Sequence, residues 1–486
     1  MVDQTAPVVA APPAVTELQA VASDRVPQVT PEAPFDPAPP HGTEQQAAAS
    51  HEVPSVTSAA AASPAPPAIQ PPGPKQPMKR WPIIAGVGVL AVAAIVGVVV
   101  VPRLSSSDSA APAPGPVISP PAASAPGVAA GMLAAGYLHT CRVTDAGGVQ
   151  CWGDNGFGQL GDGTRTDRAT PVNVVGLNES VVELSAGGYQ TCAVTSAGAV
   201  KCWGANDLGQ LGDGSTTSSP VPVAVVGLGA GVRSIASGYE HTCVVTTGGA
   251  VKCWGANESG QLGDDSTTNR LTPVDVQGLA SDVRAATAGG DYGGGQTCAL
   301  KTNGSVACWG SNRSGQLGDG TTTSQSTPVA VTTLAAGVEA ISAGDEHVCA
   351  LTVGGEVQCW GENLFGQLGN GSPGGQVTPT PVPGLGSGVR ALSSGGLHTC
   401  VITNASGVLC WGDNEYGQLG DGTTETRSTA VPVAGLTSNV GLVKAGAKST
   451  CALTGAGVEQ CWGDNESGQL GNGTTTGSST PVSVAG

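Results

Sequence analysis

A pair of cysteines ten residues apart recurs seven times along the chain, and Trp-Gly always follows the second cysteine. Successive tryptophans of this motif lie 51 residues apart, except for one step of 55. A fixed period of about 50 residues is typical of propellers, in which each repeat forms one blade of short strands. The seven copies therefore predict an all-β fold, a seven-bladed β-propeller, over residues 127–486.

The two cysteines of each copy belong to a predicted β-hairpin. In the third copy, pairing Val245 with Val251 across the turn Thr-Gly-Gly places Cys243 opposite Cys253. Directly opposed residues of antiparallel strands come close enough for a disulfide. We therefore predict seven disulfides, one within each repeat: Cys141–Cys151, Cys192–Cys202, Cys243–Cys253, Cys298–Cys308, Cys349–Cys359, Cys400–Cys410 and Cys451–Cys461.

Zinc is the competing explanation for repeated cysteines. Zinc ligands usually lie about two to four residues apart, whereas these cysteines are ten residues apart. The position two residues before the first cysteine holds histidine in four copies, but glutamine or serine in the others. A recurrent metal site would not tolerate these changes, so we predict that the protein binds no metal.

Three segments precede the repeats. Residues 1–80 are rich in Ala, Pro, Val and Ser without apolar periodicity, which predicts a disordered tail. Residues 83–101 carry no charge and no proline, and such a run spans about 28 Å as a helix, close to the thickness of a bilayer. A buried helix of a soluble domain is the alternative, but the run has no polar face. Residues 102–126 predict a linker rich in Pro, Ser and Ala.

The charges around residues 83–101 predict the orientation of this transmembrane helix. Lys75, Lys79 and Arg80 precede the run, and only Arg103 follows it closely. The positive-inside rule then places the N-terminus in the cytoplasm and the propeller in the periplasm or outside the cell. The run begins too far along the chain for a cleavable signal peptide. Disulfides in the repeats agree with an oxidising compartment.

Charge and side-chain patterns exclude several classes of function. The formal net charge is −17, with 36 acidic residues against 19 Lys and Arg, which disfavours binding to nucleic acid. Catalysis needs one asymmetric set of nucleophile, base or metal ligands, whereas the repeat histidines all share one recurrent position. Acidic loop residues lack the spacing of a calcium loop. We therefore expect no cofactor and no enzymatic activity.

Every copy continues from Trp-Gly into the pattern Trp-Gly-x-Asn-x-x-Gly-Gln-Leu-Gly, and three copies begin with His-Thr-Cys, at His139, His241 and His398. This pattern resembles the repeat of the regulator of chromosome condensation family over residues 131–486. The resemblance implies a seven-bladed propeller. It leaves the activity open, because members include a nuclear nucleotide-exchange factor, a plant ultraviolet receptor and secreted inhibitors of β-lactamases. The paired cysteines depart from the nuclear pattern and favour an exported bacterial type.

Residues that vary between copies are better site candidates than those that recur, because a single site must break the symmetry of the ring. Tyrosine and phenylalanine occur in three loops after the tryptophans and just before three first cysteines, and the fourth copy carries a glycine-rich insertion around residues 291–295. Tyrosine is a favoured anchor at protein interfaces. Scattered loop aromatics and simple variation in loop length are the alternatives. The candidate binding residues are Tyr137, Tyr189, Tyr239, Phe157, Phe365, Tyr416, Asp291 and Tyr292.

These observations predict a membrane-anchored propeller that binds another macromolecule, most readily a protein. Recognition of a glycan or of the cell wall is the second hypothesis. An enzyme such as a lyase or hydrolase is the third.

Overall fold

The computed structural model describes residues 132–292 and 294–486. Within these ranges, no helix is long and apolar enough to cross a membrane. The predicted tail (1–80), transmembrane helix (83–101) and linker (102–126) lie outside the described residues, so these three remain predictions.

The described residues form seven antiparallel sheets of four strands each, and every sheet is built from four consecutive strands. The first three blades are β1 (Leu133–Ala135), β2 (His139–Val143), β3 (Val149–Gly153) and β4 (Arg168–Asn173); β5 (Val181–Ala186), β6 (Gln190–Thr195), β7 (Val200–Gly204) and β8 (Ser219–Ala224); β9 (Val232–Ser237), β10 (His241–Thr246), β11 (Val251–Gly255) and β12 (Arg270–Asp275). The fourth and fifth blades are β13 (Val283–Asp291), β14 (Gly294–Lys301), β15 (Val306–Gly310) and β16 (Gln325–Ala330); β17 (Val338–Ala343), β18 (His347–Thr352), β19 (Val357–Gly361) and β20 (Gln376–Pro381). The last two are β21 (Val389–Ser394), β22 (His398–Thr403), β23 (Val408–Gly412) and β24 (Arg427–Pro432); β25 (Val440–Ala445), β26 (Ser449–Thr454), β27 (Glu459–Gly463) and β28 (Ser478–Ser483).

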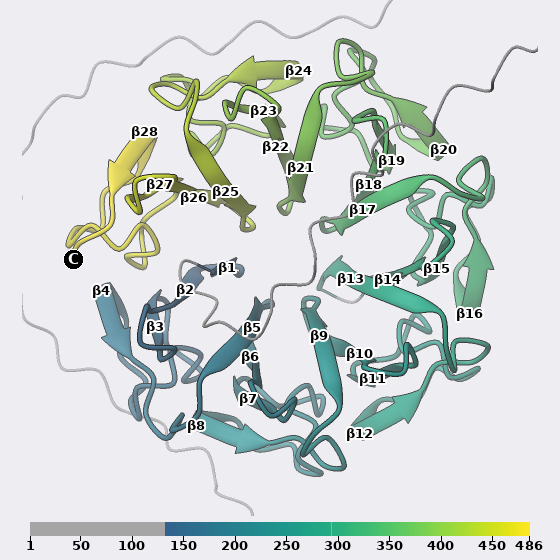
Figure 1. Cartoon of the computed structure of the whole chain (residues 1–486), viewed down its shortest axis with the longest axis vertical. Coiled ribbons are helices and arrows are strands. Elements are labelled where there is room, and N and C mark those ends of the chain that lie inside the picture. Colours follow the sequence, from purple (N-terminus) through teal and green to yellow (C-terminus); the bar gives the residue numbers. More distant parts are fainter. Residues whose placement is uncertain (1–131, 293) are drawn as a thin grey trace, which may run out of the picture. The chain divides into compact units, whose positions relative to one another are not determined.

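The blades are arranged as a ring (Figure 1). The first strand of each blade lies next to the central axis, and the fourth strand lies at the periphery. The prediction of an all-β, seven-bladed propeller is therefore confirmed.

Each repeat tryptophan is fully buried against the preceding blade. Its indole Nε1 donates a hydrogen bond of 2.9–3.0 Å to the backbone carbonyl of the glutamine in the preceding Gly-Gln-Leu-Gly segment. Trp203, for example, bonds the carbonyl of Gln159. The next glycine, Gly161, has a φ of +69°, and an added Cβ would lie 2.7 Å from the Trp203 indole nitrogen. The shared motif therefore forms the contacts between blades.

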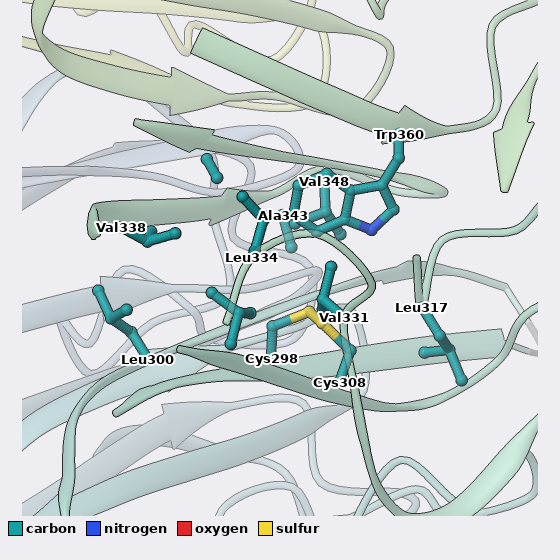
Figure 2. Close-up of a cluster of buried hydrophobic side chains, with 12 residues drawn as sticks. Cys298, Leu300, Cys308, Leu317, Val331, Leu334, Val338, Ala343, Val348 and Trp360 are labelled. Carbon is teal, nitrogen blue, oxygen red and sulfur yellow. A yellow bond between two sulfur atoms is a disulfide. The ribbon is translucent and has the colours of Figure 1, made fainter. Parts of the chain in front are cut away.

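All seven predicted disulfides are present, and all fourteen cysteines are paired. The two cysteines of each pair are direct partners on neighbouring strands, with Cα atoms 4.0–4.1 Å apart. Cys298 and Cys308 lie in a hydrophobic cluster that also contains Val331 and, from the next blade, Trp360 (Figure 2). The disulfides are thus part of the core as well as cross-links within the hairpins.

The ring closes where the seventh blade meets the first. Trp152 donates to the carbonyl of Gln469 at 3.0 Å, the same contact that the other tryptophans make one blade earlier. Arg142 and Glu459 add an ion pair of 2.6 Å across this seam. Each blade is one continuous segment in the part of the chain that the structure describes, so the ends of the ring are joined by ordinary contacts between blades.

Candidate functional site

The two faces of the ring differ in their loops. One face carries the connections from first to second strand and from third to fourth strand of every blade, and we call it the long-loop face. The opposite face carries the short hairpins between second and third strands. All eight candidate binding residues belong to connections of the long-loop face or to their immediate ends.

Recurring loop residues hold the long-loop face in shape. The side-chain oxygen of each motif glutamine accepts a hydrogen bond from the backbone nitrogen two residues earlier, as from Phe157 to Gln159 at 2.9 Å. The motif asparagine is buried and binds several loop groups; Asn155 Oδ1, for example, accepts from the Leu160 backbone nitrogen. The side-chain oxygens of these residues satisfy loop amides, which explains why the residues recur in every blade.

The central channel opens onto the long-loop face through a narrow mouth of about 90 Å³. Three residues from each blade line it, and 18 of the 21 are Gly, Ala or Ser. The three exceptions are Tyr137, Tyr239 and Asp345. The mouth is therefore symmetric in its backbone and asymmetric in its large side chains.

Close contact between neighbouring backbones explains why the mouth is built from small residues. The backbone nitrogen of Tyr137 donates to the Gly187 carbonyl at 3.1 Å, and similar bonds link most neighbouring blades around the axis. A Cβ on Gly289 would lie 2.0 Å from the Gly344 carbonyl oxygen. A side chain at Gly289 would therefore push the fourth and fifth blades apart.

Five candidate aromatic residues from four blades form one cluster, which we call the aromatic cluster: Tyr137, Phe157, Tyr189, Tyr239 and Tyr292. The rings of Tyr137, Tyr189 and Tyr239 contact one another, with centroids 5.5–5.9 Å apart. Phe157 packs on Tyr189 at 5.2 Å, and Tyr292 packs on Tyr239 at 5.6 Å. Tilted and edge-to-face pairs at these separations are favourable. Residues far apart in sequence thus build one continuous aromatic surface.

The members of the aromatic cluster differ in exposure. Tyr292 is 81% exposed and Phe157 is 37% exposed, whereas Tyr239 is only 8% exposed. Burial raises the pKa of the Tyr239 and Tyr137 hydroxyls above their ordinary value. Tyr239 is therefore largely covered and contacts the rings of Tyr137, Tyr189 and Tyr292.

Two predicted aromatic residues lie apart from this cluster. Phe365 is 38% exposed and follows Leu364, which is 80% exposed. The Tyr416 hydroxyl accepts a hydrogen bond of 3.2 Å from Lys448, whose ammonium also lies 4.4 Å from the centre of the ring. Tyr416 is thus engaged with a cation of the next blade.

The insertion of the fourth repeat forms more strand and not the glycine-rich loop that the sequence suggested. Strand β13 continues to Asp291, which pairs with Gly294 at the start of β14. Strands of glycine can approach closely because glycine has no side chain. The added residues therefore extend the pairing of β13 with β14. The longer hairpin carries the exposed Tyr292 beside Tyr239.

The sequence interpretation missed an acidic group at the channel mouth. Asp345 occupies the blade position that Tyr137 and Tyr239 hold in their own repeats. Burial, together with the carboxylates of Asp291 and Glu346, raises the pKa of Asp345 to about 7. Aligning the repeats would have identified it as the one charged residue at this position.

The recurrent histidines contact threonines of the neighbouring blades. Each is fully buried, and its Nε2 lies 2.8–2.9 Å from a threonine hydroxyl of the next blade. Among the described residues there is no group of three or more potential metal ligands. These histidines hold neighbouring blades together: His139, His241, His347 and His398.

Known proteins place this architecture in one family. The model of the "Regulator of chromosome condensation (RCC1) repeat" matches residues 146–194, 197–245, 249–294, 303–351, 354–402 and 406–453. The ultraviolet-B receptor UVR8 of Arabidopsis thaliana is 30% identical over 349 residues, which cover 70% of this chain and 78% of the receptor. The human E3 ubiquitin-protein ligase HERC2 is 33% identical over 290 residues, 58% of this chain but only 6% of that ligase.

The solved structure of Prp20p from Saccharomyces cerevisiae has the same fold. It superposes with a TM-score of 0.62 at 21% identity, over 69% of this chain and 85% of Prp20p. Six matched repeats, the seven blades and the recurring Trp and Gly-Gln-Leu-Gly contacts agree with one another. This chain belongs to the regulator of chromosome condensation (RCC1) repeat family.

Proposed function

We propose that this protein is a membrane-anchored scaffold that binds a partner protein on the long-loop face of its propeller. Residues 83–101 provide the anchor, and the propeller lies in the periplasm or outside the cell. The aromatic cluster provides the contact surface. Binding, and not catalysis, is the activity of the ring.

The aromatic cluster is the observation that carries this proposal. Aromatic residues make up only 3% of the chain, yet five of them meet in one cluster, and two of these five line the channel mouth. Tyrosines at the centre of a rigid surface are typical anchors of protein interfaces, because they bury a large area with little loss of side-chain entropy. Backbone hydrogen bonds between blades make this surface rigid before a partner arrives.

Relatives support a protein as the partner. Prp20p has been solved in complex with Kap60, and its structure was described with its binding to Gsp1p and histones. The excess of acidic residues in this chain disfavours a nucleic acid as the ligand.

The surface is tested by capture of partners from native membranes with the full-length chain. The double variant Phe157→Ala, Tyr292→Ala should reduce capture of a stoichiometric partner by about tenfold or more, because it removes the exposed rings of the cluster. Phe365→Ala is the matched control, since Phe365 occupies the same loop position as Phe157 and is equally exposed. Equal capture by both variants would contradict the assigned surface, and retention on isolated cell wall without a protein would favour a glycan ligand.

The proposed location is tested separately through the cysteines. Cells are lysed in a denaturant that contains a thiol-alkylating reagent, so that buried thiols also react, and the full-length chain is analysed by mass spectrometry. An oxidising compartment predicts no alkylated cysteine and seven disulfides within repeats. Complete alkylation of all fourteen cysteines would place the propeller in a reducing compartment and contradict the proposed orientation.

A further inference from the structure

A pocket of about 310 Å³ lies beside the aromatic cluster on the long-loop face. It is bounded by residues of the second, third and fourth blades. Tyr239 and Tyr292 form its aromatic wall, and their rings are in contact. The lengthened β13–β14 hairpin places Tyr292, Asp291 and Gly294 along one side, so the insertion of the fourth repeat creates the enclosure.

Four carboxylates line this pocket: Asp207, Glu240, Glu258 and Asp291. No Lys or Arg is among the described residues that line it. Burial raises the pKa of Glu240, and the charges of Glu258 and Asp207 raise it further. Arg313 lowers the pKa of Asp291 but does not line the pocket. The pocket therefore concentrates negative charge that no lining cation of the described residues neutralises.

The side-chain amide of Gln261 lies in the pocket wall. Gln261 is only 4% exposed, and its side-chain oxygen accepts from the Ser259 backbone nitrogen at 2.9 Å. Its Nε2 lines the pocket region near Gly295 and has no hydrogen-bond partner among the described residues. This nitrogen can therefore donate to a group that enters the pocket.

The corresponding glutamine amide differs in its hydrogen-bond partner from blade to blade. In the first blade, the corresponding Gln159 amide donates to Asp154 at 2.6 Å, and in the sixth blade Gln418 donates to Asp413 at 2.8 Å. The third blade has Ala256 in place of this aspartate, and Ala256 lines the pocket. The amides of Gln316, Gln367 and Gln469 also lack a partner among the described residues, so the third blade is distinguished by the pocket that Gln261 and Ala256 line.

We propose that this pocket binds the cationic side chain of an arginine or lysine residue. The carboxylates neutralise the cation, and the faces of Tyr239 and Tyr292 pack on it, as in other cation–π contacts. The Gln261 amide donates to a carbonyl oxygen of the same bound residue. The inference rests on the proposed function insofar as this residue belongs to the protein partner that covers the aromatic cluster.

The test uses small probes and the full-length chain in detergent. N-acetyl-arginine amide and N-acetyl-lysine amide are titrated by ligand-observed NMR, with N-acetyl-citrulline amide as the neutral analogue of the arginine probe. For probes of this size we expect a dissociation constant on the order of 1 mM for the cations and at least about tenfold weaker binding of citrulline. Raising the salt concentration should weaken cation binding because screening reduces the attraction.

Charge-neutral variants identify the pocket. The double variant Glu240→Gln, Asp291→Asn should weaken binding of both cations by about tenfold or more. Glu466→Gln is the matched control, because Glu466 occupies in the seventh blade the loop position of Glu258 and lies outside the pocket. Thermal unfolding confirms that both variants fold. Wild-type binding of the control variant and loss in the double variant would support the pocket.

Failure of the two proposals can be told apart. If citrulline binds as well as arginine, or if neither cation binds the wild-type chain, the cation pocket is wrong, even when a partner protein is still captured through the aromatic cluster. If the cations bind and depend on Glu240 and Asp291 but no protein partner is captured, the pocket stands and the proposed protein-binding function fails.

Discussion

A buried histidine occupies the same position in four blades, and its environment makes the propeller sensitive to acid. Burial lowers the pKa of His139 and His241 to about 4 and that of His347 and His398 to about 3. In the unfolded chain each imidazole regains a pKa near 6.5. The folded state therefore binds fewer protons than the unfolded state between about pH 6.5 and pH 4.

This difference gives the first prediction. As the pH falls through this window, each histidine should lower the free energy of unfolding by up to about 1.4 kcal/mol per pH unit. Replacing all four with glutamine, which the second and fourth blades already carry as Gln190 and Gln296, should remove this contribution. Urea unfolding at pH 7 and pH 5 should show a smaller loss of stability in the variant than in the wild-type chain.

Comparing the wild-type chain with the variant separates the effect of the histidines on stability from the effect of the acidic residues. Asp345 and Glu183 have pKa values raised to about 7, mainly by burial, so their contribution to stability is lost as the pH rises from about 4 to 7. This effect has the opposite sign and is common to both proteins. An equal loss of stability in wild type and variant would show that the histidines are not held neutral in the folded state.

Each disulfide cross-links the two strands of one hairpin, and the local sequence of that hairpin already predicts its pairing. The predicted pairing of Val245 with Val251 and of Cys243 with Cys253 is observed. A loop of this length gives about 2–3 kcal/mol in the chain-entropy model, and the restricted hairpin reduces that gain. Because each link is confined to one blade, the seven contributions should be nearly independent.

Removing the disulfides of two blades tests whether their contributions are independent. The paired changes Cys243→Ala, Cys253→Ala and Cys400→Ala, Cys410→Ala should each lower the free energy of unfolding by about 1–4 kcal/mol, since the buried sulfur atoms are lost as well as the link. The combined variant should show the sum within about 0.5 kcal/mol. A strongly non-additive result in urea unfolding would indicate coupling between these blades.

The hairpins and the disulfides could be predicted because they depend on residues about ten positions apart. The pairing register follows from local alternation, and the repeat supplies seven independent copies of the same evidence. The structure corrected the insertion near Asp291, because glycines allow a loop and a closely paired ladder equally well. The burial of Tyr239 depends on rings from three other blades and has no local signal.

The candidate site was predicted only in part, because contacts between different blades leave no local signal in the sequence. The tyrosines stood out by residue type, whereas Asp345, Lys448 and the pocket around Gln261 depend on which loops of different blades meet. Aligning the repeats by position gives part of this information, because Asp345 and Ala256 differ from their equivalents in other blades. The contacts between side chains of different blades are determined only when the ring is closed.

At the scale of the whole molecule, the seam between the last and first blades determines whether the ring stays closed. The Arg142–Glu459 pair at this seam is largely buried, with side chains 20% and 10% exposed. Arg142 also donates to Gln150 through two of its nitrogens. Loss of the guanidinium would leave the carboxylate of Glu459 without its ion-pair partner in a poorly solvated place.

This seam gives a further prediction with a matched control. Arg142→Ala should lower the free energy of unfolding by about 2 kcal/mol or more. Lys252→Ala removes an ion pair of the same 2.6 Å length, but within one blade and with Asp275 76% exposed, so it should cost no more than about 1 kcal/mol. Urea unfolding of both variants measures the difference, and equal small losses would mean that the ion pair does not secure the seam.

The ring has two distinct faces, and we propose that the partner binds the long-loop face. A photoreactive amino acid is placed at Tyr292, which is 81% exposed on this face, or at Val353, which is 73% exposed in a hairpin of the opposite face. Irradiation of intact cells should yield a cross-linked protein of defined mass from position 292 and none from position 353. Adducts from position 353 alone, or the same adducts from both positions, would contradict the claim.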